Sequence, residues 1–260
     1  MTNVLKKTVL LLALPVALVV LWWYVSAGSQ DFAFPPLSTI VDFFPDTWFK
    51  GRLTHDVLPS LARLAVGYTL ALVIGIGLGV PIGGSRALRA LLEPVLEFLR
   101  AIPPPVLVPI LILVAGIDNL MKVLVIVSGC VWPVLLNTVE GVRATDEVLD
   151  DTCRSYRIGG LTRLRTFVLR SASPQIMAGA RQALSIGLIL MVISETKAAS
   201  EGLGFTIIQF SRSFAIPEMW GGIILLGVIG VVLALLFTLV ERRVLNWYHG
   251  VRAAERGAPK

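Results

Sequence analysis

Charged side chains are scarce in this sequence of 260 residues. Only 15% of the residues are charged, whereas 55% are hydrophobic and the mean hydropathy is +0.80. Soluble globular domains carry about 25% charged residues. The shortage of charge therefore excludes an ordinary soluble domain and indicates a membrane protein.

Cysteine and histidine are rare too, with two residues of each. Cys130 lies in an apolar run and Cys153 in a charged loop, so no disulfide framework is expected. His55 and His249 lie near no set of residues with metal-ligand spacing, and no catalytic triad has candidates. The Gly-Gly pair at 159–160 lacks the lysine of a phosphate-binding loop. We therefore predict no metal, no cofactor, no catalytic residue and no ATP hydrolysis by this chain.

Long apolar runs are abundant by contrast. A helix needs about 20 residues to cross the ~30 Å core of a bilayer. Backbone N–H and C=O groups that are unpaired in lipid are costly, which favours helices because these pair all such groups internally. Six runs have the required length, at residues 8–25, 60–82, 95–116, 120–140, 176–194 and 220–240. We predict an all-α membrane protein, one domain over residues 1–260 with six transmembrane helices.

Positive charge is unevenly distributed over this topology. Of the 23 Lys and Arg residues, 17 fall on one side of the predicted spans. By the positive-inside rule, both termini and the long loop at about 145–175 are cytosolic. The net charge of +6 then needs no nucleic-acid partner. The six residues on the other side are Lys50, Arg52, Arg63, Lys122, Lys197 and Arg212.

Two features of the first two runs have alternative interpretations. Lys6 and Lys7 before an apolar run resemble a signal peptide, but the run exceeds the about 7–15 residues of a signal core, so we expect it to be retained. In the second run, Gly75, Gly79 and Gly83 have the spacing that lets helices approach closely. That contact lies either between subunits or within one subunit.

The third run contains Pro103, Pro104 and Pro105, followed by Pro109. Proline lacks a backbone donor and clashes with the preceding turn, so this helix must kink or break. Non-helical backbone at membrane depth is tolerated where it lines a cavity. The prolines are therefore candidates for the wall of a pathway.

Three charged residues near the spans are further pathway candidates. Glu97 and Arg100 share a helix face just before the prolines, and Glu195 ends the fifth run. Charges inside a membrane usually face a bundle interior or water. The alternative places each of them at a membrane interface, where charge is inexpensive.

The loop between the fourth and fifth runs has a helix-turn-helix pattern. Thr145 can cap a first helix, and Gly159-Gly160 can end it. A second helix begins near Leu161 and runs until Pro174. The first helix carries a narrow apolar face made of Val148, Leu149, Thr152, Cys153 and Tyr156. Such a helix can dock in a groove of a soluble partner or lie on lipid headgroups.

With these features, the chain resembles the permease subunits of bacterial ATP-binding-cassette importers in the nitrate, sulfonate and taurine group. The family's cytosolic signature reads Glu-Ala-Ala, three residues, Gly, a hydrophobic stretch and a late Pro. Here Asp151-Thr152-Cys153 stands at the triplet, Arg157 at the Gly and Pro174 at the late Pro, so the Asp and the Arg depart from the pattern. Other matching stretches are Arg100-Ala101-Ile102-Pro103, Glu195 with Gly202-Leu203-Gly204, and Ile216-Pro217-Glu218-Met219-Trp220.

The resemblance implies a MetI-like permease bundle in the bacterial cytoplasmic membrane. It implies a second permease copy, two ATP-binding subunits at the cytosolic loop, and an extracytoplasmic solute-binding protein. The transported solute would be a small anion such as a sulfonate, taurine or nitrate. The alternative is an ATP-independent carrier or channel. The residues that the resemblance assigns to coupling with the ATPase are Asp151, Thr152, Cys153, Tyr156, Arg157, Gly159, Gly160 and Pro174.

Overall fold

The computed structural model describes residues 2–197, 199–248 and 250. Within these ranges the chain is helical and contains no strand, which confirms the predicted all-α class. The α-helices are α1 (Thr2–Ser26), α2 (Leu37–Phe44), α3 (Leu58–Gly84), α4 (Arg86–Arg100), α5 (Val108–Ala115), α6 (Asn119–Arg143), α7 (Glu147–Ser155), α8 (Gly160–Arg163), α9 (Leu169–Lys197), α10 (Leu203–Arg212) and α11 (Ile216–Val244). Shorter segments are η1 (Pro45–Phe49), η2 (Leu53–Val57), η3 (Pro104–Leu107) and η4 (Leu164–Val168).

Four helical stretches of the described chain are long and apolar enough to cross a membrane by themselves. They are Leu53–Gly84, Asn119–Arg143, Gly160–Lys197 and Ile216–Val244, and they contain the second, fourth, fifth and sixth predicted spans. Within α1, the part whose side chains the structure describes includes the apolar helix Ala13–Ser26, which is shorter than these stretches. The count of six spans therefore stays a prediction.

The third predicted span is broken. Residues 95–116 do not form one helix, because α4 ends at Arg100 and the chain turns through η3 into α5 with a bend of 79°. Pro103 has an extended backbone, with ψ 125°. The break predicted from the prolines is confirmed, and α4 with α5 forms either one bent span or a re-entrant loop.

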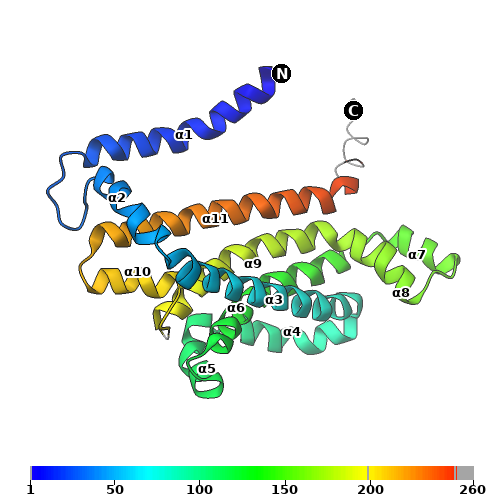
Figure 1. Cartoon of the computed structure of the whole chain (residues 1–260). Helices are drawn as coiled ribbons and strands as arrows, with labels where there is room; N and C mark the ends of the chain where they lie inside the picture. The colour runs from blue at the N-terminus through cyan, green and yellow to red at the C-terminus, as the bar shows by residue number, and fades with distance from the viewer. Residues whose placement is uncertain (1, 198, 249, 251–260) are drawn as a thin grey trace.

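The core of the bundle lies where α3, α6 and α9 pack together (Figure 1). Its buried residues are Leu64, Ala71, Val108, Met121, Val125, Ile126, Cys130, Val134, Ala183, Leu190 and Met191. In contrast, none of the most apolar stretch of α11 is buried. A helix that is apolar all round and unburied suits a lipid environment, so α11 faces lipid or another subunit.

The glycines of the second predicted span contact α6 of the same chain. A Cβ atom added at Gly75 would lie 2.7 Å from Val134 Cγ1, and one at Gly79 would lie 2.6 Å from Thr138 Cβ. Glycine at these positions allows the two helix backbones to approach closely. The close contact is therefore within one subunit.

The two ends of the bundle differ in structure. At one end, α2, η1, η2 and α10 cover the core, with the Trp48 ring fully buried beside Leu203 and Ile207. At the other end, α7 and α8 project away from the bundle (Figure 1). The first residues of α1 and the last of α11 lie toward this second end (Figure 1). Residues 251–260, predicted to be cytosolic, lie outside the described part of the chain.

Candidate functional site

The loop between α6 and α9 begins with a capped helix. The Asp146 Oδ1 atom accepts hydrogen bonds from the backbone N–H groups of Val148 and Leu149, at 2.8 and 3.2 Å. The prediction that Thr145 caps this helix was wrong, because the Thr145 hydroxyl donates to the Val142 carbonyl instead. A carboxylate at the start of α7 both pairs the free N–H groups and interacts favourably with the helix dipole.

A left-handed residue ends α7. The Ile158 N–H donates to the Cys153 carbonyl at 2.8 Å, and between them Arg157 has φ 53°. This hydrogen bond across a residue of positive φ is the Schellman ending of a helix, where glycine is preferred. Arg157 is the residue that stands at the family's Gly. The change from Gly to Arg therefore keeps the backbone turn but puts a residue with a Cβ atom in a strained backbone conformation.

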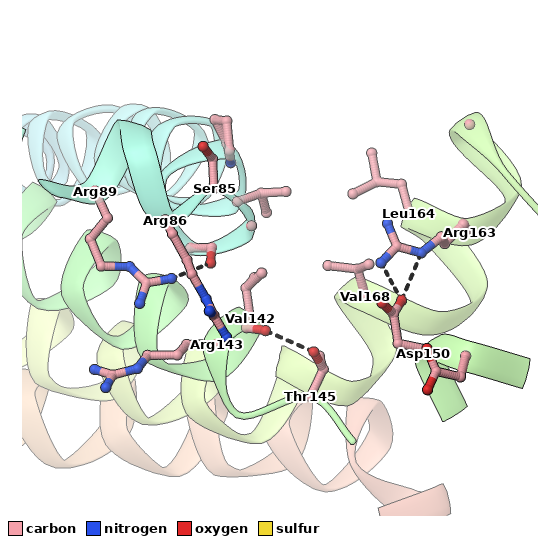
Figure 2. Close-up of a pocket in the computed structure, with 16 residues that line it drawn as sticks. Ser85, Arg86, Arg89, Val142, Arg143, Thr145, Asp150, Arg163, Leu164 and Val168 are labelled. Atoms are coloured by element: carbon pink, nitrogen blue, oxygen red, sulfur yellow. Dashed lines mark hydrogen bonds and ion pairs between the residues drawn. The ribbon is translucent and has the colours of Figure 1, made fainter. Parts of the chain in front are cut away.

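An ion pair joins the two arms of the loop. Arg163 of α8 donates through Nε to the Asp150 Oδ1 atom of α7 at 3.0 Å, and a second guanidinium nitrogen also reaches this oxygen (Figure 2). Phe167 and Val168 are buried against Val142 at the end of α6. An apolar cluster thus connects the loop to the bundle, and an ion pair connects α7 to α8 within the loop.

The second arm of the loop continues into the membrane. The prediction that its helix ends at Pro174 was wrong, because Gly160–Lys197 is one helical stretch that contains this proline. Pro174 has no N–H to pair with the carbonyl four residues earlier, that of Arg170. The Ser173 hydroxyl donates to this carbonyl at 2.8 Å and so replaces the missing partner.

One side of the loop exposes apolar groups to solvent. Val148 is 73% exposed and Tyr156 is 77% exposed, and Leu149 and Leu161 are also exposed. Asp151 and Thr152 are exposed as well, whereas Cys153 is half-buried and packs against the cluster around Phe167 and Val168. The face predicted for α7 is therefore divided, with Cys153 turned inward. Gly159 and Gly160 form the connection between the arms, and a Cβ atom at either would meet nothing within 4 Å.

The predicted pathway candidates lie in separate places. Glu97 and Arg100 form an ion pair on α4, with Nε to Oε2 at 2.8 Å, and both are about half exposed. Of the prolines, Pro104 packs beside Gly129 of α6, while Pro103 and Pro105 are exposed. Glu195 lies in neither group, since it belongs to the covered end of the bundle.

The Glu195 side chain is fully buried. Its Oε1 atom accepts hydrogen bonds from Ser60 at 2.6 Å and from Arg63 at 2.8 Å. Its Oε2 atom accepts from the Gly204 N–H at 2.9 Å. The carboxylate therefore links α3, α9 and the start of α10. A pathway role for Glu195 stays a prediction, because here its oxygens are occupied by protein donors.

A polar strip on α9 has no counterpart among the predicted site residues. Gln182 and Ser185 are exposed side chains in the middle part of a membrane-crossing stretch. Asn137 of α6 donates to Gln182 Oε1 at 3.4 Å. Gln175 and Ala178 continue the same face at helical spacing. This spacing is visible in the sequence and is the signal that could have identified the strip.

Polar groups at this depth need water or protein beside them. Amide and hydroxyl groups exposed to hydrocarbon lose their hydrogen bonds, which costs several kcal/mol. The strip on α9 therefore faces an aqueous path or a second polypeptide. No group of three or more His, Cys, Asp or Glu with metal-binding geometry occurs in the described ranges.

A bundle of membrane-crossing helices, a sharp bend between α4 and α5, and a projecting helix pair are features of the transmembrane subunit of a transport system. Residues 71–246 match the family described as binding-protein-dependent transport system inner membrane component. The chain belongs to this family. It is therefore a transport subunit of an ATP-driven importer, and ATP hydrolysis takes place on a separate subunit.

Named relatives extend the comparison over most of the chain. A putative aliphatic sulfonates transport permease protein, SsuC of Bacillus subtilis, is 29% identical over 238 residues, which cover 91% of this chain and 86% of the relative. The bicarbonate transport system permease protein CmpB of Synechococcus elongatus is 31% identical over 195 residues, which cover 75% of this chain and 70% of the relative.

A solved structure shares the fold. The inward-facing MetNI methionine ABC transporter contains a chain that superimposes with a TM-score of 0.65 at 18% identity. The match covers 73% of this chain and 94% of the other. Together with the family match, this supports the predicted importer permease bundle.

Proposed function

We propose that two copies of this chain form the path of a small anion through the bacterial cytoplasmic membrane. Two ATP-binding subunits dock on the cytosolic loops, and an extracytoplasmic binding protein delivers the solute to the other side. The observation that carries this proposal is the exposed apolar face of α7, on a loop that is firmly joined to the bundle. An aqueous loop gains nothing from such a face unless a partner covers it.

The connection of the loop to the bundle supports its role in coupling. The Asp150–Arg163 pair holds α7 against α8, and α8 continues through η4 into α9. A push on α7 is therefore transmitted along one continuous helical stretch to the polar strip. This is the geometry needed for closure of the ATP-binding subunits to move a membrane helix as a rigid body.

The docking surface can be tested with charge substitutions. Val148→Glu combined with Tyr156→Glu places two carboxylates on the apolar face of α7. We expect this variant to insert normally, to lose co-purification of the ATP-binding subunit, and to lose binding-protein-stimulated ATP hydrolysis in proteoliposomes. Tyr156→Phe keeps the apolar ring and serves as the matched control. Full subunit retention and full stimulation in the double variant would rule out docking at this face.

The polar strip of α9 is our proposal for the path lining. Gln182→Leu with Ser185→Ala should lower the uptake rate without lowering the melting temperature of the complex. Val232→Leu, on the unburied α11, is the control because its side chain lies on the apolar outer face. Uptake equal to that of the control would show that the strip does not line the path. The same proposal includes the bend that brings α5 beside α6. This bend is formed at Pro103, Pro104 and Pro105.

The class of solute follows from the relatives. SsuC is named for aliphatic sulfonates and CmpB for bicarbonate, both of which are small oxyanions. We extend this class to the present chain, with sulfonate, taurine and nitrate as the first candidates. Mass spectrometry of the ligand that co-purifies with the associated binding protein tests the assignment, and a cationic ligand would contradict it.

Orientation is the last part of the proposal. We place both termini in the cytosol, in agreement with the charge distribution and with the first residues of α1 and the last of α11, which lie toward the end of the bundle that carries α7 (Figure 1). Cysteines introduced near Asp151 should react with a membrane-impermeant thiol reagent only in inverted vesicles. Solute accumulation by this chain alone would favour the alternative of an ATP-independent carrier.

A further inference from the structure

An open cavity lies at the joint between the bundle and the cytosolic loop (Figure 2). Its volume is about 970 Å³. The turn from α3 into α4, the end of α6 and the two arms of the loop form its walls. Neither the polar strip of α9 nor the exposed face of α7 contributes to these walls, so the cavity is a separate feature of the molecule.

Basic side chains dominate the walls. Arg86, Arg89 and Arg143 lie on the bundle side of the cavity, and Arg163 lies across from them on the loop (Figure 2). Two aspartates, Asp150 and Asp151, are the acidic residues of the lining. Asp150 is paired with Arg163, so the charge on the bundle side is not balanced by it.

The three arginines on the bundle side have donors to spare. The Arg86 side chain is exposed and makes no hydrogen bond or ion pair with the described part of the chain. Arg89 donates through Nη2 to the Gly83 carbonyl at 2.6 Å, but its Nε atom is buried without a partner. Arg143 reaches Glu140 only at 3.5 Å on an exposed surface. A guanidinium carries five donors, so Arg86 and Arg143 have donors free for a ligand, and the buried Nε of Arg89 is a donor whose lack of a partner is costly.

We propose that this cavity binds an oxyanion with several acceptor oxygens, such as a phosphate or a sulfonate. Arginine presents paired N–H groups that match two oxygens of such a group, and charge-assisted hydrogen bonds of this kind are the strong ones. The anion accepts from the guanidinium of Arg86, with Arg89 and Arg143 nearby. Because one wall belongs to the loop, the bound anion couples to the position of α7 and α8.

Two sources can supply this chemistry. The cavity lies at the cytosolic end of the spans, where phospholipid phosphates are abundant. It also lies where a transported anion would leave the bundle. Both sources present oxygens of the same kind to the same arginines, so the site is defined by the oxyanion and the experiment separates the sources.

The test uses the full chain without its ATP-binding partner, which has phosphate sites of its own. In a maltoside detergent, which carries no phosphate, sodium phosphate and sodium sulfate are titrated against sodium chloride at matched ionic strength, with the melting temperature as readout. In detergent, phosphatidylglycerol retained by the chain is measured by native mass spectrometry. We expect saturable binding in at least one of these two arms.

Charge-matched variants assign the binding to the cavity. Arg86→Gln should weaken it about tenfold or more, since a lost charge-assisted hydrogen bond is worth at least about one decade in affinity. Arg165→Gln is the control, because Arg165 is exposed on the same loop and does not line the cavity. Arg89→Gln should weaken binding in the same way. Because Arg89 also donates to the Gly83 carbonyl, its loss can disturb the local fold. Arg86 has no such bond, so Arg86→Gln tests binding without that effect.

The possible outcomes distinguish a soluble anion, a lipid headgroup and the absence of a binding site. Protection by phosphate or sulfate that Arg86→Gln removes identifies a soluble anion. Retention of phosphatidylglycerol that Arg86→Gln removes identifies a lipid headgroup. Absence of binding in both arms overturns the proposal, and so does an equal loss in Arg86→Gln and Arg165→Gln. None of these outcomes depends on docking of an ATP-binding subunit at α7.

Discussion

Arg63 of α3 and Glu195 of α9 form a buried ion pair, with the guanidinium nitrogen 2.8 Å from the carboxylate oxygen. Arg63 also donates to Asn119 at 2.6 Å and to Glu201 at 2.7 Å. Ser60 donates to Glu195 and accepts from the Leu203 N–H at 2.9 Å. The network therefore ties together the ends of α3, α6 and α9 at the end of the bundle opposite α7 and α8.

Loss of the Glu195 carboxylate should destabilise the protein strongly. Glu195→Leu leaves a buried guanidinium with only the half-exposed Glu201 as a charge partner, and breaking a buried pair costs about 3–5 kcal/mol. Arg63→Met together with Glu195→Leu should cost less than the sum of the single changes. Thermal unfolding in detergent measures both effects. Glu97→Gln breaks an exposed pair, worth about 1 kcal/mol or less, and a similarly small effect for Glu195→Leu would refute the assignment.

A methyl group at Gly79 should separate two helices. The added Cβ would lie 2.6 Å from Thr138 Cβ, so α3 and α6 must move apart. Overpacking of this kind costs about 1–3 kcal/mol, and we expect Gly79→Ala to lower the melting temperature. Gly77→Ala adds the same group to the same helix, where nothing lies within 4 Å. Equal melting temperatures for the two variants would show that the close approach does not matter.

Arg157 is a position where glycine should improve the local backbone. Its φ of 53° costs a residue with a Cβ atom about 1 kcal/mol, which glycine avoids. We expect Arg157→Gly to keep or raise the melting temperature, because the relief of strain is partly offset by the entropy of glycine in the unfolded chain. Arg157→Val should lower it, since a branched side chain is poorly tolerated at positive φ. Identical effects of Gly and Val would contradict a left-handed residue here.

The bend after α4 should depend on its prolines. Changing Pro103, Pro104 and Pro105 to leucine restores backbone donors and removes a bias against helix of about 3 kcal/mol per residue. We expect α4 to lengthen, the 79° bend to decrease, and uptake to fall. Distances between spin labels on α4 and α5, together with uptake in proteoliposomes, measure these changes.

Pro109 provides the control for this prediction. It lies in the first turn of α5, where a helix does not use the N–H group that proline lacks. Pro109→Leu should therefore leave the bend unchanged. Wild-type uptake in the triple leucine variant would remove the prolines from the transport mechanism.

The loop shows how far a local pattern can be interpreted. The positions of α7 and of the Gly159-Gly160 connection followed from helical periodicity and glycine. The cap was assigned to Thr145 although Asp146 makes it, because two adjacent residues had suitable side chains. The continuation of the second arm through Pro174 was missed, because a proline usually ends a helix and the compensating bond from Ser173 is a contact in space.

The sequence alone predicts a helical membrane protein with a basic loop on one side, because hydrophobic runs and charge counts are properties of local segments. It also predicts that the third run must break, since proline restricts its own backbone. Three contacts became visible only in the folded chain: Arg63 meets Glu195, Gly79 packs on Thr138, and Arg86 shares a cavity with Arg163. These contacts join residues far apart in the chain, and their partners depend on how the helices pack.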